Sequence, residues 1–457
     1  MTTLAEDMAI WVAQLRYEEL PSEVVAKAKR ILLDTVGCAL GALDAVPVRM
    51  ARQVVREQGG NPQAAPLGAA WKTSCEQAAF LNGMALRYLD FNDYAASGSP
   101  THSSINVAPA LSVAQARGLT GKDLLLGITV GYEVQLRLRD ASAKGKREGW
   151  DSSTTAHYSA AAVAGRLLGL TPVKMAHALA IAGSHASTLG EVRRGKLSMW
   201  KGAAEPMGAR SGTFAALLAD AGLTGPLTVL DGKYGYGKMV AGALDVKLLR
   251  ERSGDFRILK SCTKVSPCVF IAQAPIAAAL KIHSQGLAIE EIKMITVGLG
   301  DLGYKNQQRY LKGGITTRED ADHSVPYCVA RVFVDGELRL DHFEEKALKD
   351  PRVLELVKKV SFRRDPKLTA LYPEITGANV EVMLRNGNTL KAEFPYPPGH
   401  TRNPLSDDGL VRKFLGLADG LLVKDQAQKA VEMILHVEDL SDVGVLRDTL
   451  CVAGEVD

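Results

Sequence analysis

The sequence has 457 residues, more than one compact core usually holds, so we expect two domains. Hydrophobic residues make up 46% and charged residues 23%, as in ordinary globular proteins, and a net charge of +4 with interspersed signs argues against a nucleic-acid partner. No run of about 18 uncharged apolar residues occurs, and the N-terminal stretch lacks the basic region of a signal peptide, so we expect no membrane span and a cytoplasmic location.

The first half of the chain has the spacing of amphipathic helices. Over residues 22–41, Ser22 is a suitable N-cap, and apolar residues such as Val25, Ile31 and Val36 recur at helical intervals. Further Ala- and Leu-rich segments predict helices at residues 76–89, 106–117, 122–137, 155–169, 173–187 and 203–221. So many successive helices without strand signals predict an all-α domain.

The pattern changes near residue 255. Residues 292–300 are rich in β-branched side chains, and residues 379–394 alternate apolar and polar residues around Asn386-Gly387, which predicts a strand and a hairpin. Helical patterns lie among these strands at residues 268–284, 321–333 and 351–359. From about residue 406 to 439 the pattern is helical again. The sequence therefore predicts a mostly α protein with a helical domain of residues 1–255, completed by 406–457, and a smaller α+β domain of residues 256–405.

A polar segment, residues 90–106, interrupts the apolar helices of the first domain. It contains Asp90, Asp93 and His102, and its Gly98, Pro100 and serines disfavour a helix. A carboxylate beside an imidazole is a general base with an orienting partner. A helix cap and a solvated loop histidine explain the same residues equally well.

Two lysines precede apolar helical patterns. Lys201 follows Trp200 within a basic stretch, and Lys264 comes shortly before Pro267. An ammonium at either place suits a carboxylate-bearing substrate. Taken alone, each lysine is better explained as a solvated surface residue than as a substrate-binding one.

A third polar group, "ADHSVPYCVA" at residues 321–330, precedes another apolar stretch. Asp322 and Ser324 are suitable helix caps, and the Tyr327 hydroxyl is a potential donor to an oxygen of the substrate. The six cysteines form no CxxC pair, so we expect reduced thiols and no zinc or iron–sulfur site.

In order along the chain, the motifs "ILLDTVGCALGA", "YLDFND", "SMWKGAA", "KVSP", "ADHSVPYCVA" and "PPGHTRNPLS" resemble the MmgE/PrpD family. That family includes 2-methylcitrate dehydratase, cis-aconitate decarboxylase and iminodisuccinate epimerase. The resemblance implies a large helical domain formed by both chain ends, an α+β lid, a homodimer, and an active site in the cleft between the domains. It implies no metal and no organic cofactor, and a small-molecule carboxylate as substrate.

The resemblance also assigns site residues. It implies the catalytic residues Asp90, His102, Lys201, Lys264 and Tyr327, and the substrate-binding residues Asp93, Gln273 and His323. Several positions depart from the family pattern. Decarboxylase-like members carry histidines where this sequence has the segment around Ser152 and Val269, and a further family histidine corresponds, with a shifted gap, to Gln273. Tyr94 replaces a threonine, and Ser103 replaces a proline. The departures argue against decarboxylation of cis-aconitate.

The chemistry shared by the family is removal of a proton from a carbon next to a carboxylate. Fixed cations stabilise the developing enediolate, and a positioned base takes the proton. We expect Lys201 and Lys264 to bind carboxylates. We expect His102 to act as base, with Asp90 orienting it or sharing that role, and Tyr327 to act as an acid or a hydroxyl donor. Three hypotheses follow: a dehydratase of a di- or tricarboxylate, a dicarboxylate epimerase, and a non-catalytic carboxylate binder.

Overall fold

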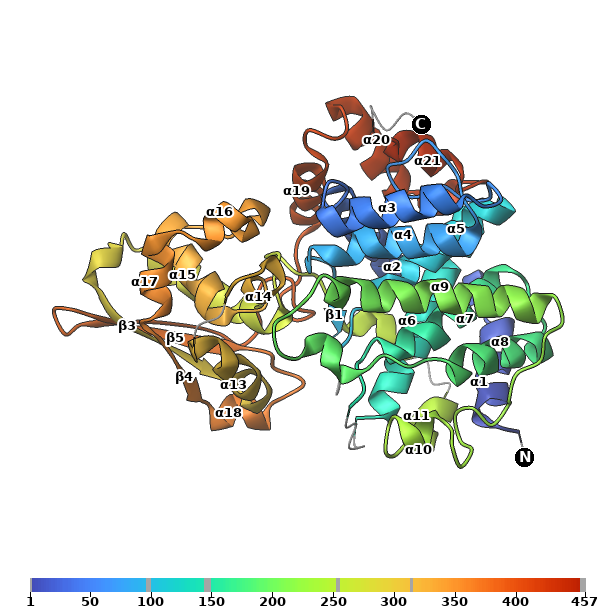
Figure 1. Cartoon of the computed structure of the whole chain (residues 1–457), viewed down its shortest axis with the longest axis horizontal. Coiled ribbons are helices and arrows are strands. Elements are labelled where there is room, and N and C mark those ends of the chain that lie inside the picture. The colour runs from blue at the N-terminus through green and yellow to red at the C-terminus, as the bar shows by residue number, and fades with distance from the viewer. Residues whose placement is uncertain (1, 96–99, 144–148, 252–254, 313–314, 453–457) are drawn as a thin grey trace. The chain divides into compact units, whose positions relative to one another are not determined.

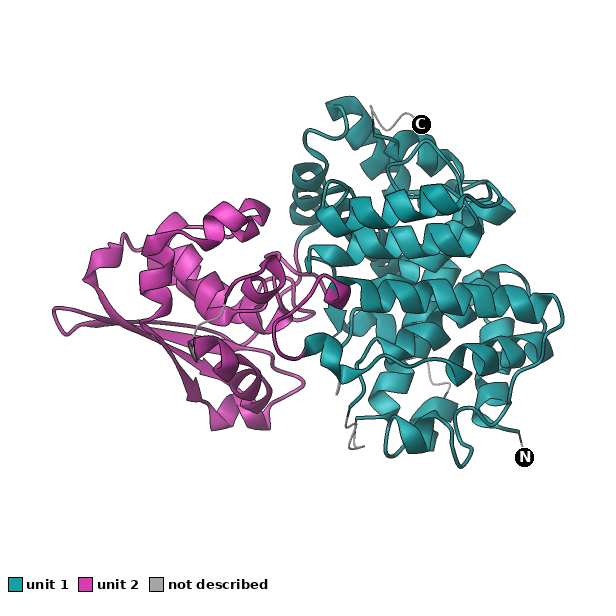
Figure 2. Cartoon of the chain, viewed as in Figure 1, with its two compact units in different colours: residues 1–193, 202–261, 406–457 teal, residues 194–201, 262–405 magenta. Residues whose placement is uncertain are grey.

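Helices make up most of the chain in the computed structural model, which describes all residues except 1, 96–99, 144–148, 252–254, 313–314 and 453–457 (Figure 1). The chain divides into unit 1, residues 1–193, 202–261 and 406–457, and unit 2, residues 194–201 and 262–405 (Figure 2). The prediction of a mostly α fold with a smaller α+β part is confirmed. Gly98, cited above as a helix breaker, lies outside the described residues.

Unit 1 is a set of packed helices. Its elements are α1 Leu4–Gln14, α2 Ser22–Leu40, α3 Val46–Gln58, α4 Cys75–Tyr88, β1 Tyr94–Ala95, α5 Val107–Arg117, α6 Gly121–Ala141, α7 Thr154–Leu167, α8 Pro172–Ser184, α9 Trp200–Asp220, α10 Tyr236–Met239, α11 Val246–Arg250, α19 Asp407–Ala418, α20 Lys424–Leu435 and α21 Val445–Leu450. Helix α9 begins in the residues assigned to unit 2. The tightest pairs are α6 with α7, α1 with α8, and α4 with α5. None of the helices in the described residues has the length and hydrophobicity that a membrane span requires.

The C-terminal helix α19 fixes the segment that contains Asp90 and Asp93. It packs along α2, and its Lys413 ammonium donates to the Phe91 carbonyl at 2.8 Å while pairing with Asp34 at 2.7 Å. The same ammonium lies 3.8 Å from the Phe91 ring centroid, within cation–π range. The return of the chain after residue 406 therefore anchors the polar segment through a buried ion pair.

Unit 2 is built on a four-stranded sheet with the order β4-β3-β5-β6. The strands are β3 Ile292–Leu299, β4 Val360–Arg364, β5 Ala378–Leu384 and β6 Thr389–Phe394, and β2 Ser261–Cys262 lies at the unit boundary. Strands β3 and β4 are parallel, whereas β5 is antiparallel to both β3 and β6. The β5–β6 hairpin turns at Gly387 with φ 91°, a conformation that favours glycine, which confirms the predicted turn.

Helices α12 Gln273–His283, α13 Asp301–Gln307, α14 Arg318–Ala321, α15 Val325–Asp335, α16 Glu345–Leu348, α17 Pro351–Val357 and α18 Pro366–Ala370 complete unit 2. Helix α12 packs on β5 and β6, and α15 packs on α12 and α17. The alternating burial along β5 places Val380 and Val382 in this core, as its period-2 pattern predicts.

Two predicted helices of unit 2 are shorter than expected. The helix predicted over residues 321–333 is broken at residues 322–324, because the Ser324 hydroxyl caps the backbone N–H of Tyr327 and Pro326 occupies the first turn of α15. The helix predicted from residue 268 begins at Gln273, after a single 3₁₀ turn over Phe270–Ala272. Each break lies at a residue that the resemblance assigns to the site, His323 in the first and Gln273 at the end of the second.

Candidate active site

Asp90 is held at the end of α4 by a buried arginine. The Arg87 guanidinium donates through Nη1 to Asp90 Oδ1 at 2.6 Å and through Nε to Glu205 Oε2 at 2.5 Å. Burial by itself lowers the pKa of Arg87, but the carboxylates of Asp90 and Glu205 outweigh it and hold that pKa above its ordinary value. Both side chains of the Arg87–Asp90 pair are fully buried.

Asp90 also has an unusual backbone. Its φ is 50°, and within the described part of the chain no other non-glycine residue has a positive φ. This left-handed conformation costs an L-residue about 1 kcal/mol, less for aspartate than for most residues. Strain of this kind is retained where a side chain must be aimed, which marks Asp90 as a candidate site residue.

His102 is oriented by the backbone of the same segment. Its Nδ1 lies 2.7 Å from the Asp93 carbonyl oxygen, which can only accept, so Nδ1 carries the proton and donates. In a neutral ring this assigns the lone pair to Nε2, which lies 3.8 Å from Asp90 Oδ1. The structure therefore brings Asp90 and His102 together in unit 1, with the basic nitrogen on the side of Asp90.

The Asp93 carboxylate supports this arrangement from within unit 1. Oδ2 accepts from the Tyr132 hydroxyl at 2.7 Å and from the Ser261 hydroxyl, and Oδ1 accepts from the Ser104 backbone N–H at 3.1 Å. Burial, and then the Asp93 charge, raises the pKa of Tyr132 well above its ordinary value, so Tyr132 stays a donor. The carboxylate of Asp93 is occupied by the protein, and its carbonyl holds His102.

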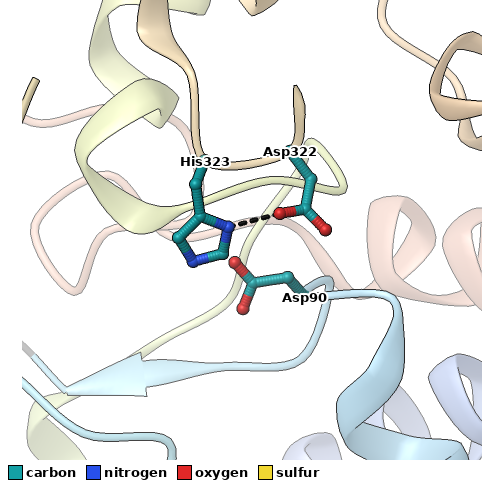
Figure 3. Close-up of side chains that lie close together, drawn as sticks. All are labelled: Asp90, Asp322 and His323. Atoms are coloured by element: carbon teal, nitrogen blue, oxygen red, sulfur yellow. Dashed lines mark hydrogen bonds and ion pairs between the residues drawn. The ribbon is translucent and has the colours of Figure 1, made fainter. Parts of the chain in front are cut away.

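A second polar group lies in unit 2 around His323. Nδ1 of His323 forms a short hydrogen bond with the Asp322 carboxylate (Figure 3), and the Lys201 ammonium lies 3.5 Å from the same nitrogen. Since a carboxylate accepts and an ammonium donates, the closer Asp322 makes Nδ1 the proton-bearing atom. The basic nitrogen of neutral His323 is then Nε2, as in a carboxylate-oriented acid–base pair.

Backbone contacts fix the break that carries Asp322 and His323. The Asp322 carbonyl accepts from the Val269 N–H at 2.8 Å, and the His323 carbonyl accepts from Gln307 Nε2 at 2.9 Å. Gln307 Oε1 in turn accepts from the first N–H of α15, at Val325 and 2.9 Å. The missing helical hydrogen bonds of residues 322–324 are replaced by tertiary ones, which keeps both site side chains in place.

Lys264 lies on the irregular segment of unit 2 that precedes α12. Its neighbour Val265 donates its backbone N–H to Gln273 Oε1 at 3.1 Å, and Ser266 does so at 3.2 Å. The structure thus connects Gln273 to the backbone that carries Lys264.

Tyr327 is placed inside unit 2 rather than at its polar group. Its side chain belongs to the hydrophobic core, packs near Phe343, and donates its hydroxyl to the His342 backbone carbonyl. Burial raises the pKa of Tyr327 to about 12, which suits a stable donor. These contacts give Tyr327 a structural role in the core.

A cavity of about 230 Å³ also lies in unit 2, at the end of β3. Its lining is mostly apolar and includes Phe270, Ile271, Leu299, Leu368 and Ile375, and it contains none of the site residues that the sequence assigns. Because the described residues of its wall include no lysine or arginine, this cavity is unsuited to a carboxylate.

Asp151 lies in the segment where decarboxylase-like proteins were expected to have a histidine. Arg193 binds it with two hydrogen bonds, Nε to Oδ2 at 2.5 Å and Nη2 to Oδ1 at 3.2 Å, and Ser153 donates to it twice more. Burial alone raises the pKa of Asp151, but Arg193 outweighs it, so that pKa lies well below its usual range. An aspartate held ionised in this way is a poor proton donor, so it does not replace a histidine.

His157, five residues after Ser152, is a buried neutral imidazole. Its Nδ1 is buried without a hydrogen-bond partner, and burial, followed by the charge of His185, lowers its pKa to about 4. Because the pKa is lower in the folded than in the unfolded state, stability is complete above the ordinary pKa of about 6.5 and falls as the pH decreases towards 4.

We therefore expect His157 to make the protein less stable by about 2 kcal/mol at pH 5 than at pH 8. Replacing it by phenylalanine should remove that part of the pH dependence, measured as the difference in unfolding free energy between the two pH values. The His436→Phe variant, which changes an exposed histidine at the end of α20, is the matched control and should retain it. If His157→Phe and the unmodified protein lose the same unfolding free energy between pH 8 and pH 5, burial does not lower the pKa of His157 and this prediction is wrong.

Several residues that contact the site were not assigned from the sequence, and three of them hold its acidic and basic groups directly. Arg87 and Glu205 hold Asp90, and Asp322 orients His323. Arg87 lies one helical turn before Asp90, a spacing that signals a contact. Glu205 lies in α9, far along the chain, and only the fold brings it to Arg87.

Fold and side chains together define a mostly α protein with an α+β insertion, in which oriented imidazoles accompany buried carboxylates and lysine ammonium groups. Comparison with known proteins identifies the family. Residues 6–249 match the MmgE/PrpD N-terminal domain and residues 266–439 match the MmgE/PrpD C-terminal domain. The chain belongs to the MmgE/PrpD family, which confirms the resemblance seen in its motifs.

Similar proteins span almost the whole chain. The cis-aconitate decarboxylase of Homo sapiens is 28% identical over 471 residues, covering 98% of this chain and 95% of the relative. The 2-methylcitrate dehydratase of Salmonella typhimurium is 27% identical over 421 residues, covering 85% and 84%. A cis-aconitate decarboxylase of Aspergillus terreus is 23% identical over 480 residues, covering 98% and 96%.

Proposed function

We propose that this chain is a lyase that removes water from a small di- or tricarboxylate of the 2-methylcitrate type. The observation that carries the proposal is the oriented imidazole of His102, whose Nδ1 donates to the Asp93 carbonyl and whose Nε2 lies beside Asp90. Membership in a family whose relatives include a 2-methylcitrate dehydratase supports the choice of reaction.

In the proposed reaction, His102 Nε2 takes a proton from the carbon next to a substrate carboxylate. Lys201 and Lys264 bind the carboxylates and stabilise the enediolate that forms, because fixed cations lower the energy of developing negative charge. The C–OH bond then breaks, a C=C bond forms, and the hydroxyl leaves as water after receiving a proton.

In this proposal His323, and not Tyr327, donates that proton: it starts as the imidazolium, gives the Nε2 proton to the departing hydroxyl, and becomes the neutral ring whose Nδ1–H stays bonded to Asp322. The Asp322 carboxylate orients its ring, and Lys201 lies next to it. Tyr327 already donates to a backbone carbonyl within the core. The exchange of roles follows from these contacts, since a general acid must have a proton that it can direct to the substrate.

We expect His323→Gln to separate the two halves of the reaction. Loss of the acid should slow water elimination by about 10²-fold or more, whereas exchange of the substrate α-proton with deuterated solvent should continue because the base is intact. The two rates are measured on the same samples by absorbance of the unsaturated product and by NMR. If exchange falls in parallel with elimination, His323 is not a separate acid.

The function itself is tested with a panel of acids. 2-Methylcitrate, citrate and smaller hydroxydicarboxylates are incubated with the protein, and the unsaturated acid and water balance are followed by absorbance and NMR. Formation of an alkene without loss of carbon supports the dehydratase. Proton exchange with inversion and no alkene would support the epimerase hypothesis, and binding without turnover would support the non-catalytic one.

Decarboxylation of cis-aconitate is the second candidate, because two of the similar proteins named above carry that activity. Three positions at which decarboxylase-like or other family members carry histidines argue against this candidate. Asp151 is held ionised, Val269 has no ionisable group, and the Gln273 amide is bonded to the backbone. Release of carbon dioxide from cis-aconitate, measured directly, would favour this candidate over dehydration.

We further propose that the protein forms a homodimer, as the family resemblance implies, and that it works in the cytoplasm. Light scattering should give twice the mass of one chain, and a fluorescent fusion should be distributed through the cytoplasm. A monomeric mass or an organellar pattern would remove the corresponding proposal.

A further inference from the structure

Gln273 lies at the start of α12, and its side chain is buried. Its Oε1 accepts the backbone N–H groups of Val265 and Ser266 at 3.1 and 3.2 Å. Its Nε2 donates to the carbonyls of Ser266 and Cys268 at 2.9 and 3.3 Å, and it also lies 3.3 Å from Cys268 Sγ, a weak acceptor in the same segment. A primary amide has two donors and two acceptor lone pairs, so these four bonds use its whole capacity.

The four bonds are all made to one short segment. Residues 264–268 have no regular secondary structure, and Pro267 supplies no N–H, so their backbone groups find few partners of their own. In place of the hydrogen bonds of a helix or sheet, the glutamine amide satisfies two backbone N–H groups and two backbone carbonyls of this segment. A side chain engaged in this way has no hydrogen-bonding capacity left for a substrate.

The residue before Lys264 is held as well. The Thr263 N–H donates to the Gly399 carbonyl at 2.9 Å. Gly399 has φ 86°, and a Cβ at this position would lie 1.9 Å from the Thr263 carbonyl oxygen, so only glycine allows this approach. Lys264 is therefore bracketed by Gly399 on one side and by Gln273 on the other.

We propose that Gln273 is a positioning residue, which fixes the backbone of residues 265–268 so that Lys264 is presented in one orientation. The inference rests on the proposed function, since it takes Lys264 as the cation that binds a substrate carboxylate. The Lys264 side chain is fully buried, so its direction depends on the backbone that carries it, and a fixed backbone holds the ammonium in one place before the substrate arrives. Gln273 thus acts on the reaction through Lys264 and not through the substrate.

The first test measures the backbone and is independent of catalysis. Hydrogen exchange is followed by mass spectrometry in peptides that cover residues 263–268, in the full-length protein and in Gln273→Ala. We expect faster exchange in the variant, because Val265 and Ser266 lose their acceptor. Gln285→Ala, which removes an exposed glutamine just beyond α12, is the control and should leave these peptides unchanged. Unchanged exchange in Gln273→Ala would overturn the inference.

The second test asks whether the effect passes through Lys264. With the acid found to turn over, Gln273→Ala should lower kcat/KM by about 10²-fold, the size of effect that a small misplacement of a binding group produces. In a Lys264→Met background the same change should add little. If Gln273→Ala lowers kcat/KM in the Lys264→Met background as much as it does alone, the inference is overturned.

If no acid in the panel is turned over, citrate binding is measured by calorimetry in the unmodified protein, in Gln273→Ala, in Lys264→Met and in the double variant. Weaker binding in both single variants, without further weakening in the double variant, supports the inference even though the proposed reaction has failed. Binding that Lys264→Met leaves unchanged would overturn both the role of Lys264 and the inference.

Discussion

Replacing His102 by glutamine is expected to lower kcat/KM by about 10²–10⁴-fold, because a positioned general base contributes that much to proton abstraction. Glutamine keeps a donor that can reach the Asp93 carbonyl, but it has no basic nitrogen in the place of Nε2. The variant should therefore fold and bind carboxylates while the chemical step is slow. Steady-state rates on the acid identified in the panel give the value.

The control for this prediction is His436→Gln, which changes an exposed histidine of the same unit just after α20. Its rate and its melting temperature should equal those of the unmodified protein. The melting temperature of His102→Gln should also be close to that value, so that a rate loss is not caused by unfolding. Near-full turnover by a folded His102→Gln variant would exclude His102 as the base.

A comparison of His102 with Asp93 shows why contacts change the interpretation of a motif. Both belong to the DFND-containing segment, and the sequence assigns Asp93 to substrate binding. In the structure, three donors from Tyr132, Ser104 and Ser261 occupy its carboxylate, and its carbonyl orients His102. A role for Asp93 in supporting the base therefore has more support than contact with a substrate.

The periodic parts of the fold were predictable from the sequence. Apolar residues at helical spacing predict α2, and the β5–β6 hairpin follows from alternation around Asn386-Gly387. These signals are local, since each depends on residues within one or two turns of the chain. The fold class, which the structure confirms, was predictable because it depends on these local signals.

The break at residues 322–324 was not predicted, although its signals are present. Ser324 and Pro326 start a new helix, but the apolar pattern continues across them and favours one long helix. What stabilises the break is tertiary: Val269 and Gln307 supply the hydrogen bonds that a helix would have provided. No local pattern contains that information.

The candidate site has the same limit. The resemblance selected Asp90, His102, Lys201 and Lys264 by their motifs, but motifs do not state which atoms meet. The pairing of Arg87 with Glu205 joins residues 118 positions apart, and the amide of Gln273 matches a loop whose shape the sequence does not reveal. The residue types of the site were predictable. The orientations of the side chains, the tautomers of the two histidines and the contacts that hold them required the structure.

Arg87→Met is expected to destabilise the protein by about 3–5 kcal/mol, the cost of leaving buried charges without their partner. Arg87 is fully buried, and its removal leaves the carboxylates of both Asp90 and Glu205 without the guanidinium. Methionine has an unbranched side chain that fills much of the space of the arginine stem. The loss of stability therefore reports mainly the missing charge and less a new cavity. The value is obtained from urea unfolding at neutral pH, with the exposed Arg16→Met as the control that should change stability little.

Neutralising the two carboxylates should recover much of this loss. In a variant that combines Arg87→Met with Asp90→Asn and Glu205→Gln, no unpaired charge remains, so stability should rise above that of Arg87→Met alone. Recovery would mean that the guanidinium exists to allow an ionised Asp90 to be buried beside His102. If Arg87→Met instead costs no more than the Arg16 control, Asp90 is already neutral in the folded protein, and it then provides no negative charge to stabilise the imidazolium that proton abstraction creates on His102.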